Sequence, residues 1–258
     1  MTTREALFEN GEAMRTTLRV EDTERAQAEG GTAPGFEQMI TETAYGALWT
    51  RPGLSLQDRM ICTLSALCVQ PHAAALKRFV GAALDIGLDA RAILEVFVQC
   101  GLYGGFPLTE TASAVAKTVF TERGIAIAAE PDRDESLDVL QLRGDDLLAD
   151  LHGARGRQGY AAPDNPVTDG LYSLAIQYGY GELWFRPGLD RRSRMLCALA
   201  AFTALRLESQ VRKFSQSAIA LGLTREEVVE AVMQTAPYSG FPPALNALAA
   251  ISEVLSAD

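Results

Sequence analysis

Four side chains of this sequence could move a proton during a reaction: His72, Tyr103, Glu208 and Tyr238. An unperturbed imidazole titrates near neutral pH, and a phenol or a carboxyl group can transfer a proton when its surroundings suit. Each residue also has a structural interpretation. His72 could cap a surface helix after Pro71, the tyrosines could be core residues with satisfied hydroxyl groups, and Glu208 could lie at a solvated helix start. The four are therefore candidate catalytic residues whose role depends on where the fold places them.

Arginine side chains are candidate ligands for a substrate carboxylate, because a guanidinium group can hold it with two parallel hydrogen bonds. Arg51 and Arg186 occupy the same place in two copies of a short motif, "LWTRPGL" and "LWFRPGL". An internal salt bridge or a clamp on carbonyl groups is the alternative for both. The other candidate binding residues are two polar neighbours of Glu208 and a set of large apolar side chains: Arg206, Gln210, Trp49, Met60, Phe79, Phe106, Trp184, Met195, Phe214 and Phe241.

The composition narrows the class of function. The chain has 258 residues and a formal net charge of −10, so it repels phosphate backbones and nucleic acid is not an expected partner. No metal site is expected, because the four cysteines form no Cys-x-x-Cys pair and only two histidines are present. No apolar run reaches the roughly 18 residues of a membrane span, and the N-terminus lacks a signal-peptide core. These features predict a soluble, cytoplasmic protein that does not contact membranes.

The candidate residues recur because the chain is an internal duplication. When residues 45–119 are compared with 180–254 at a constant shift of 135, 26 of the 75 positions are identical without a gap, which excludes chance. "YGGFP" from Tyr103 then matches "YSGFP" from Tyr238. We expect a first repeat at 1–124, a linker at 125–135 and a second repeat at 136–258. The segment "GDDLLADL" near the start of the second repeat echoes "GEAMRTTL" in the first.

The elements that position these residues are predicted to be helices. Ser55 and Asp190 precede apolar helical patterns as N-caps, and Asp89 and Thr224 start the next helix of each repeat. Thr224 is followed three residues later by Glu227, which is the pattern of a capping box. There is no convincing period-two run. The sequence therefore predicts an all-α fold made of two tandem helical-bundle repeats.

The chain resembles the carboxymuconolactone decarboxylase family, which also contains the alkyl hydroperoxidase D-like proteins. The resemblance is carried by "YGALWTRPGL", "DRM", "ALDIGLDARAILEVF" and "YGGFP", in this order and again in the second repeat. It implies the alkyl hydroperoxidase D-like fold and no cofactor. It also implies a homo-oligomer, in which a tandem chain takes the place of a dimer and assembles as a trimer.

The chain departs from this family at the reactive cluster. The resemblance places the family's reactive glutamates, cysteines and histidine at four positions in each repeat, and other side chains occupy them here. Without the Cys-x-x-Cys pair, thiol peroxidase chemistry is excluded. The replacements also make the expected pocket apolar, which suits a hydrophobic or aromatic ligand. They are Met60, His72, Ala75 and Phe79 in the first repeat and Met195, Leu207, Gln210 and Phe214 in the second.

Two functions of different classes remain. The first is a cofactor-free lyase or isomerase, decarboxylase-like, that acts on a small hydrophobic lactone, a β-keto acid or an aromatic polyketide-like acid. An arginine would hold the carboxylate, and His72 or a tyrosine would supply the proton. The second is a ligand-binding or assembly protein that kept the fold and lost the chemistry. If only one repeat is active, we expect side chains to fill the pocket of the other.

Three expectations concern specific surroundings. Phe79, Met60 and Tyr103 are expected to form an apolar wall around His72. His152 has no motif around it and is expected to be exposed. The helices that carry Arg59 and Arg194 should be buried, and a buried arginine needs a partner, for which the carboxylates present in both repeats are available. These carboxylates are Glu95 and Glu230.

Overall fold

The computed structural model describes residues 2–20, 33–129, 133–162 and 165–256, and within these ranges the chain is helical without a β-strand. Residues 130–132 of the expected linker lie outside the described residues. The all-α prediction is confirmed. The described part contains no helix that is both long and apolar enough to cross a membrane.

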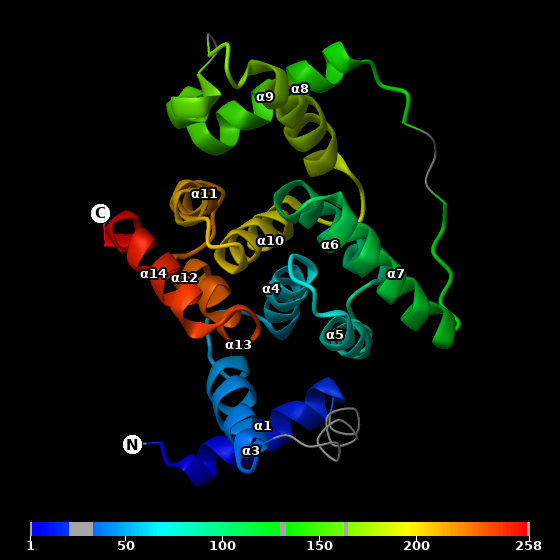
Figure 1. Ribbon diagram of the computed structural model, residues 1–258, viewed down its shortest axis with the longest axis vertical. Coiled ribbons are helices and arrows are strands. Elements are labelled where there is room, and N and C mark those ends of the chain that lie inside the picture. Colours follow the sequence, from blue (N-terminus) through cyan, green and yellow to red (C-terminus); the bar gives the residue numbers. More distant parts are fainter. Residues whose placement is uncertain (1, 21–32, 130–132, 163–164, 257–258) are drawn as a thin grey trace.

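The first repeat contains two groups of helices. The first group consists of α1 (Arg4–Leu18), α3 (Phe36–Ile40) and the π-helical segment η1 (Thr41–Trp49). The second consists of α4 (Leu56–Cys68), α5 (Ala73–Asp85), α6 (Ala90–Gly104) and α7 (Phe106–Glu122). We call the first group the N-terminal arm, because it extends from one end of the molecule (Figure 1).

The second repeat follows the same order. Its arm, the second arm, consists of α8 (Leu137–His152), the short turns η2 (Gly153–Arg157) and η3 (Gly159–Ala161), α9 (Asp169–Leu174), η4 (Ala175–Glu182) and η5 (Leu183–Phe185). The body helices are α10 (Arg191–Ala204), α11 (Glu208–Ala220), α12 (Arg225–Gln234), α13 (Ala236–Ser239) and α14 (Phe241–Ser256). Where the first repeat has the continuous α6, the second has α12 and α13, because Pro237 lacks the N–H that would continue the helical ladder.

The predicted N-caps are confirmed. The side chain of Ser55 accepts a hydrogen bond from the backbone of Asp58, and Asp190 accepts one from Ser193. Thr224 and Glu227 form both bonds of a capping box. These local signals fix where the central helices begin, so that the motif "RPGL" lies in the corner before α4 and again before α10.

The two arms are built alike. In the N-terminal arm α1 packs against η1, and in the second arm α8 packs against η4. A Cβ atom on Gly46 would overlap the carbonyl oxygen of Leu7, and one on Gly181 would overlap that of Leu140. Only glycine allows this close approach of two helix backbones. The duplication therefore extends into the arms, as the echo of "GEAMRTTL" in "GDDLLADL" indicates.

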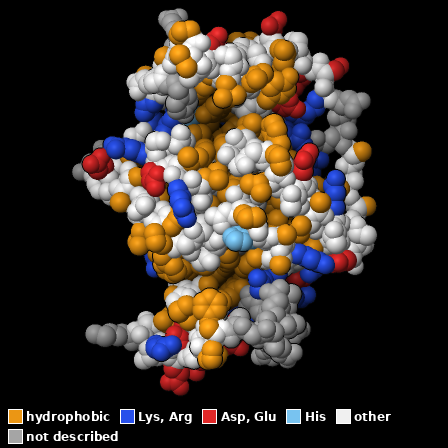
Figure 2. All heavy atoms as spheres, in the orientation of Figure 1, with side chains coloured by type: hydrophobic (Ala, Val, Ile, Leu, Met, Phe, Trp, Pro, Cys, Tyr) orange, Lys and Arg blue, Asp and Glu red, His pale blue; other side chains and the backbone are white. Residues whose placement is uncertain are grey.

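The core lies where the two repeats meet. Helices α4 and α10 pack against each other in the centre of the molecule, α10 also contacts α6, and α12 contacts α4 (Figure 1). Met60, Met195 and Cys197 are completely buried there. Hydrophobic side chains also gather where each arm meets the body (Figure 2). The repeats are thus halves of one interlocked core, with an arm at either end.

Candidate functional site

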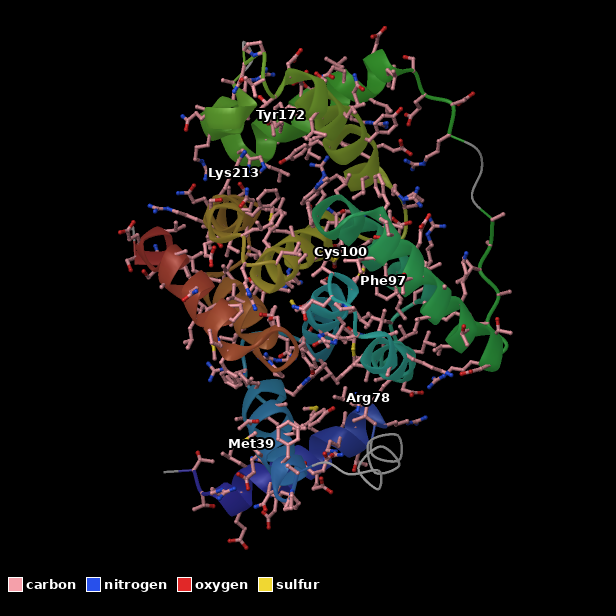
Figure 3. The ribbon with its side chains drawn as sticks, viewed as in Figure 1. Met39, Arg78, Phe97, Cys100, Tyr172 and Lys213 are labelled. Atoms are coloured by element: carbon pink, nitrogen blue, oxygen red, sulfur yellow. The ribbon has the colours of Figure 1, made fainter. Side chains whose placement is uncertain are left out.

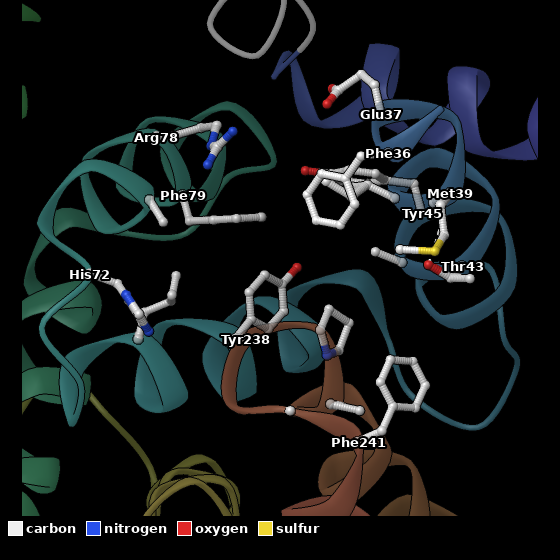
Figure 4. A pocket seen from close by; sticks show the side chains of 17 residues that line it. Phe36, Glu37, Met39, Thr43, Tyr45, His72, Arg78, Phe79, Tyr238 and Phe241 are labelled. Carbon is white, nitrogen blue, oxygen red and sulfur yellow. Dashed lines mark hydrogen bonds between the residues drawn. The ribbon is translucent and has the colours of Figure 1, made fainter. Parts of the chain in front are cut away.

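A cavity of about 510 Å³ lies between the N-terminal arm and the body. On the arm side it is lined by Phe36, Glu37 and Tyr45 among others, and on the body side by helix α5 with Arg78 and Phe79. Figure 4 shows these side chains on opposite sides of a shared space, with Tyr238 below them. We call this the first cavity.

A second cavity, of about 460 Å³, lies between the second arm and the body. Its lining repeats that of the first cavity at the shift of 135 residues: Leu171, Tyr180, Lys213 and Phe214 take the places of Phe36, Tyr45, Arg78 and Phe79. Figure 3 shows Met39 and Arg78 at one end of the molecule and Tyr172 and Lys213 at the other. Both repeats have therefore kept a cavity, and neither is filled by its own side chains.

Each cavity is completed by a tyrosine from the other repeat. Tyr238 lines the first cavity, where its ring lies 5.2 Å from that of Phe79 in an edge-on contact. Tyr103 lines the second cavity, where its ring lies 4.4 Å from that of Phe202. The expectation that Tyr103 lies beside His72 is thus wrong. The end of α6 packs toward the second repeat, because α6 contacts α10 across the interlocked core.

Both phenol groups are held as hydrogen-bond acceptors. The indole Nε1–H of Trp49 donates to the Tyr238 oxygen at 2.7 Å, and the amide Nε2 of Gln99 donates to the Tyr103 oxygen at 2.8 Å. Burial raises the pKa of Tyr103 well above its ordinary value, and the Gln99 bond only partly offsets this rise. This phenol therefore keeps its proton and can act as a donor toward a ligand.

The cavities also share a cation, which the sequence reasoning missed. Arg78 and Lys213 both line their cavities and are partly buried. The signal was present in the sequence, because "KRF" and "RKF" align at the shift of 135 with the positive charges preserved in reversed order. A cation in an apolar cavity can hold the carboxylate of a small acid.

His72 lies at the edge of the first cavity and is exposed to solvent. Its Nε2 atom lies 3.0 Å from the side-chain oxygen of Gln70 (Figure 4 shows the imidazole at the side of the cavity). It begins α5 but caps no backbone N–H with its side chain. Of its expected neighbours, Phe79 lines the same cavity and Met60 is completely buried outside the lining.

The other candidate residues divide between cavities, core and surface. Phe241 lines the first cavity, and Gln210 and Phe214 line the second. Glu208 and Arg206 line neither. Phe106 is 65% exposed and lies outside the lining of both cavities. Three further residues are buried in the core and are not among the described lining residues of these two cavities: Trp49, Trp184 and Met195.

Arg51 and Arg186 are bound to carboxylates of the protein. Arg51 pairs with Glu230 at 2.7 Å, and Arg186 pairs with Glu95 at 2.8 Å. Neither arginine is among the described lining residues of these two cavities. Arg51 and Arg186 therefore form internal salt bridges, which was the alternative to their binding a substrate carboxylate.

The completely buried arginines, Arg59 and Arg194, pair with glutamates as expected, but each glutamate belongs to the other repeat. Arg59 Nη2 donates to Glu230 at 2.9 Å and to the carbonyl oxygens of Arg51 and Pro52. Arg194 makes the matching bond to Glu95 at 3.1 Å. Each arginine therefore ties the "RPGL" corner of its own repeat to a helix of the other.

His152 is buried, so the expectation that it is exposed is wrong. It is 1% exposed, and its ring nitrogens lie 2.7 Å from Ser217 Oγ and 2.9 Å from the Tyr180 hydroxyl. Its ring also packs edge-on against Phe214. The spacing of four from the buried Leu148 would have placed it on the apolar face of α8. Because Tyr180 and Phe214 line the second cavity, His152 packs directly behind the wall of that cavity.

The stability of the protein should decrease as the pH is lowered, because His152 is buried in its neutral form. Burial, with Lys213 and Arg155 nearby, lowers its pKa from 6.5 to about 3. The unfolded chain binds this proton below about pH 6.5, whereas the folded chain does so only near pH 3. The contribution is therefore complete above pH 6.5 and is lost progressively as the pH falls toward 3.

Between pH 7 and pH 5 we expect this one group to cost about 2 kcal/mol of unfolding free energy. Urea unfolding of His152→Gln should show a smaller difference between the two pH values than the parent protein shows. His72→Gln, at an exposed histidine, is the control and should keep the parent difference. Equal pH dependence in all three proteins would contradict the assignment.

The cysteines are buried and free. Burial raises the pKa of Cys62, Cys100 and Cys197 well above the ordinary range, which disfavours the reactive thiolate. We expect no thiol peroxidase activity, and a coloured disulfide reagent should titrate these thiols in urea but only slowly in the native protein. Rapid peroxide reduction that disappears in Cys62→Ala or Cys197→Ala would contradict this.

The described residues contain no group of three or more histidine, cysteine, aspartate or glutamate side chains arranged to hold a metal ion. The polar side chains that line the cavities are instead phenols, two threonine hydroxyls, one amide and the two cations, with His72 and Glu37 in the first cavity. Such groups can hold an organic acid and exchange a proton with it.

Comparison with known proteins gives the family. The model of the carboxymuconolactone decarboxylase family matches residues 34–118 and again residues 170–253. The 4-carboxymuconolactone decarboxylase of Acinetobacter baylyi is 31% identical over 91 residues, which are 35% of this chain and 68% of that protein. The nitrosuccinic acid decarboxylase of Metarhizium robertsii is 32% identical over 83 residues, which are 32% of this chain and 58% of that protein.

A solved structure shows the same fold along nearly the whole chain. It is a protein of Burkholderia xenovorans LB400 described as a gamma-carboxymuconolactone decarboxylase subunit, with a TM-score of 0.53 and 17% identity. The match covers 95% of this chain and 97% of that one.

Proposed function

Because this chain belongs to the carboxymuconolactone decarboxylase family, we propose that it is a cofactor-free, decarboxylase-like lyase that acts on a small hydrophobic acid. One observation carries the proposal. Each cavity combines a cation from one repeat with a phenol from the other: Arg78 with Tyr238, and Lys213 with Tyr103. This pairing is present in both repeats. The two relatives with named activities are both called decarboxylases, which supports the same class of reaction.

The walls of the cavities indicate what the acid looks like. The first cavity is lined by aromatic and aliphatic side chains such as Phe36, Phe79 and Phe241, and the second by Phe202, Phe214 and Leu171. Such walls favour an apolar or aromatic body over a small dicarboxylate. The volumes, about 510 and 460 Å³, fall in the usual range of small-molecule sites. A β-keto acid or lactone with an aromatic body is the substrate class that we propose.

The chemistry for a β-keto acid follows from these groups. The cation orients the carboxylate, and the C–C bond to it breaks to release CO₂. The electron pair moves to the ketone oxygen, where a phenol O–H donates a hydrogen bond to the developing charge. A proton from solvent or from the phenol then adds to the carbon. In the first cavity Tyr238 and His72 would supply these protons, and in the second cavity Tyr103 would do so. Glu208 lies outside both cavities and has no step in this scheme.

The proposal can be tested with benzoylacetate, a β-keto acid with an aromatic ring. The purified protein should accelerate the release of CO₂ and acetophenone above the spontaneous rate. Turnover should persist after treatment with a metal chelator, because the scheme uses side chains alone. A rate equal to the spontaneous one for benzoylacetate and for a panel of aromatic β-keto acids and lactones would contradict the proposal.

The alternative is a ligand-binding protein without turnover. The replacement of the family's reactive cluster in both repeats favours it. It would be supported if the same acids raised the melting temperature in a saturable way and were recovered unchanged.

We also propose that the protein is a homo-oligomer with three copies of the chain. The second arm carries large apolar side chains open to solvent, among them Leu142, Val167 and Leu171, the last of which is 78% exposed. Burying such side chains favours self-association. Light scattering at micromolar concentration should give about three times the 27.8 kDa of one chain. A single monomeric mass would contradict this expectation.

A further inference from the structure

The two cavities differ in one chemically decisive residue. The cation of the first is a guanidinium group, which keeps its proton and is not a nucleophile. The cation of the second is the primary amine of Lys213. A primary amine that loses its proton can add to a carbonyl carbon, and lysines in apolar pockets do so in enzymes that form Schiff bases.

We propose that Lys213 is a Schiff-base nucleophile and that the second cavity binds ketone-bearing acids covalently. The inference rests on the proposed function and gives its reaction a better electron sink than the ketone oxygen. Decarboxylation leaves an electron pair that a protonated imine accepts more readily than a ketone does. None of the cavity's other described residues offers such a sink.

The surroundings of Lys213 favour the neutral amine. It lines a cavity whose walls include Leu171, Phe202 and Phe214. Burial lowers the pKa of this lysine, and the positive charge of Arg155 lowers it further.

The phenols of the cavity suit the proton transfers of imine formation. Tyr103 lies at one side and keeps its proton, and Tyr172 and Tyr180 come from the second arm (Figure 3 shows Tyr172 on the arm above Lys213). Tyr180 is in turn held by its contact with His152. A phenol can protonate the hydroxyl group that leaves as water when the imine forms.

Each step balances without a further reactant. The neutral amine adds to the ketone carbon, and water leaves to give a protonated imine. The C–C bond to the carboxylate then breaks, CO₂ leaves, and the electron pair neutralises the imine nitrogen as an enamine. The enamine carbon takes a proton, and water adds back to release the ketone and free Lys213. The net reaction converts the keto acid anion and one proton into a ketone and CO₂.

The chain provides its own controls for a trapping experiment. It has three lysines, and the other two, Lys77 and Lys117, are exposed. Lys77 forms a surface ion pair with Glu122. The full-length protein is incubated with benzoylacetate, reduced with borohydride, digested and mapped by mass spectrometry. Borohydride converts an imine into a stable secondary amine.

We expect labelling at Lys213 to exceed that at Lys77 and Lys117 by about tenfold or more, as for an amine activated by its surroundings. The adduct should carry a phenylethyl group if CO₂ has left before reduction. Lys213→Arg, which keeps the charge but cannot form an imine, should show no such adduct while retaining the parent circular dichroism spectrum. Lys77→Arg should be labelled at Lys213 like the parent.

The possible results separate this inference from the proposed function. Equal labelling of the three lysines, or release of CO₂ that persists unchanged in Lys213→Arg, overturns the Schiff base and leaves the decarboxylase proposal standing. Selective labelling of Lys213 by a keto acid that retains its carboxylate supports the Schiff base and contradicts decarboxylation of that acid.

Discussion

Glu230→Gln is expected to lower the free energy of unfolding by about 3–5 kcal/mol, because it leaves a buried charge without its counter-ion. Glu230 is 2% exposed and Arg59 is 1% exposed. Arg59 Nη2 lies 2.9 Å from the carboxylate and also holds two carbonyl groups of the "RPGL" corner. Glutamine keeps the shape of the side chain and removes the charge, so the change isolates the ion pair.

Urea unfolding followed by circular dichroism measures this effect, and the chain offers a matched control. Glu253 pairs with Arg212 at the same distance of 2.9 Å, but on the surface, where such pairs contribute about 0–1 kcal/mol. Glu253→Gln should therefore hardly change the midpoint. Glu95→Gln should behave like Glu230→Gln, because Glu95 holds Arg194 in the same way. A similarly small decrease in the free energy of unfolding for all three variants would contradict a structural role of the ion pairs that Arg59 and Arg194 form with the other repeat.

Replacing both cavity tyrosines, in Tyr103→Phe/Tyr238→Phe, is expected to lower kcat for a β-keto acid by about 10²-fold, the scale for losing a proton donor. Phenylalanine keeps the ring contacts with Phe202 and Phe79 and removes the hydroxyl group. Tyr238→Phe alone should remove the turnover of the first cavity, and Tyr103→Phe alone that of the second.

Pairs of substitutions test directly whether each cavity combines residues of both repeats. Arg78→Met should add little to Tyr238→Phe, because both act on the first cavity. It should add its full effect to Tyr103→Phe, although Arg78 and Tyr103 lie in the same repeat. Measured kcat/KM values give the coupling energies. If Arg78 were coupled to Tyr103 of the same repeat and not to Tyr238 of the same cavity, this result would contradict the proposal that each site combines a cation and a phenol from different repeats.

The helices, their caps and the repeat could be predicted because they depend on near neighbours in the chain. Ser55, Asp190 and Thr224 cap the helices that their sequences predict, since a cap needs only a side chain and a backbone N–H three residues away. The pairing of the buried arginines with glutamates was also predictable as chemistry, because a buried charge requires a partner.

The choice between equivalent partners could not be predicted. Arg59 has two glutamates at matching places, Glu95 and Glu230, and each cavity has two matching tyrosines. A duplicated sequence presents both options with the same local pattern, so only the way in which α4, α6, α10 and α12 pack decides between them. The burial of His152 was decided in the same way, by the packing of α8 against α11.

The sequence by itself thus determined that this chain is all-helical and duplicated, and that its buried arginines have carboxylate partners. The tertiary structure alone decided that these partners, and the phenols of both cavities, cross from one repeat to the other. The physical reason is that helix formation is local, whereas the interlocking of two similar halves depends on which packing buries the shared core around Met60 and Met195 most completely.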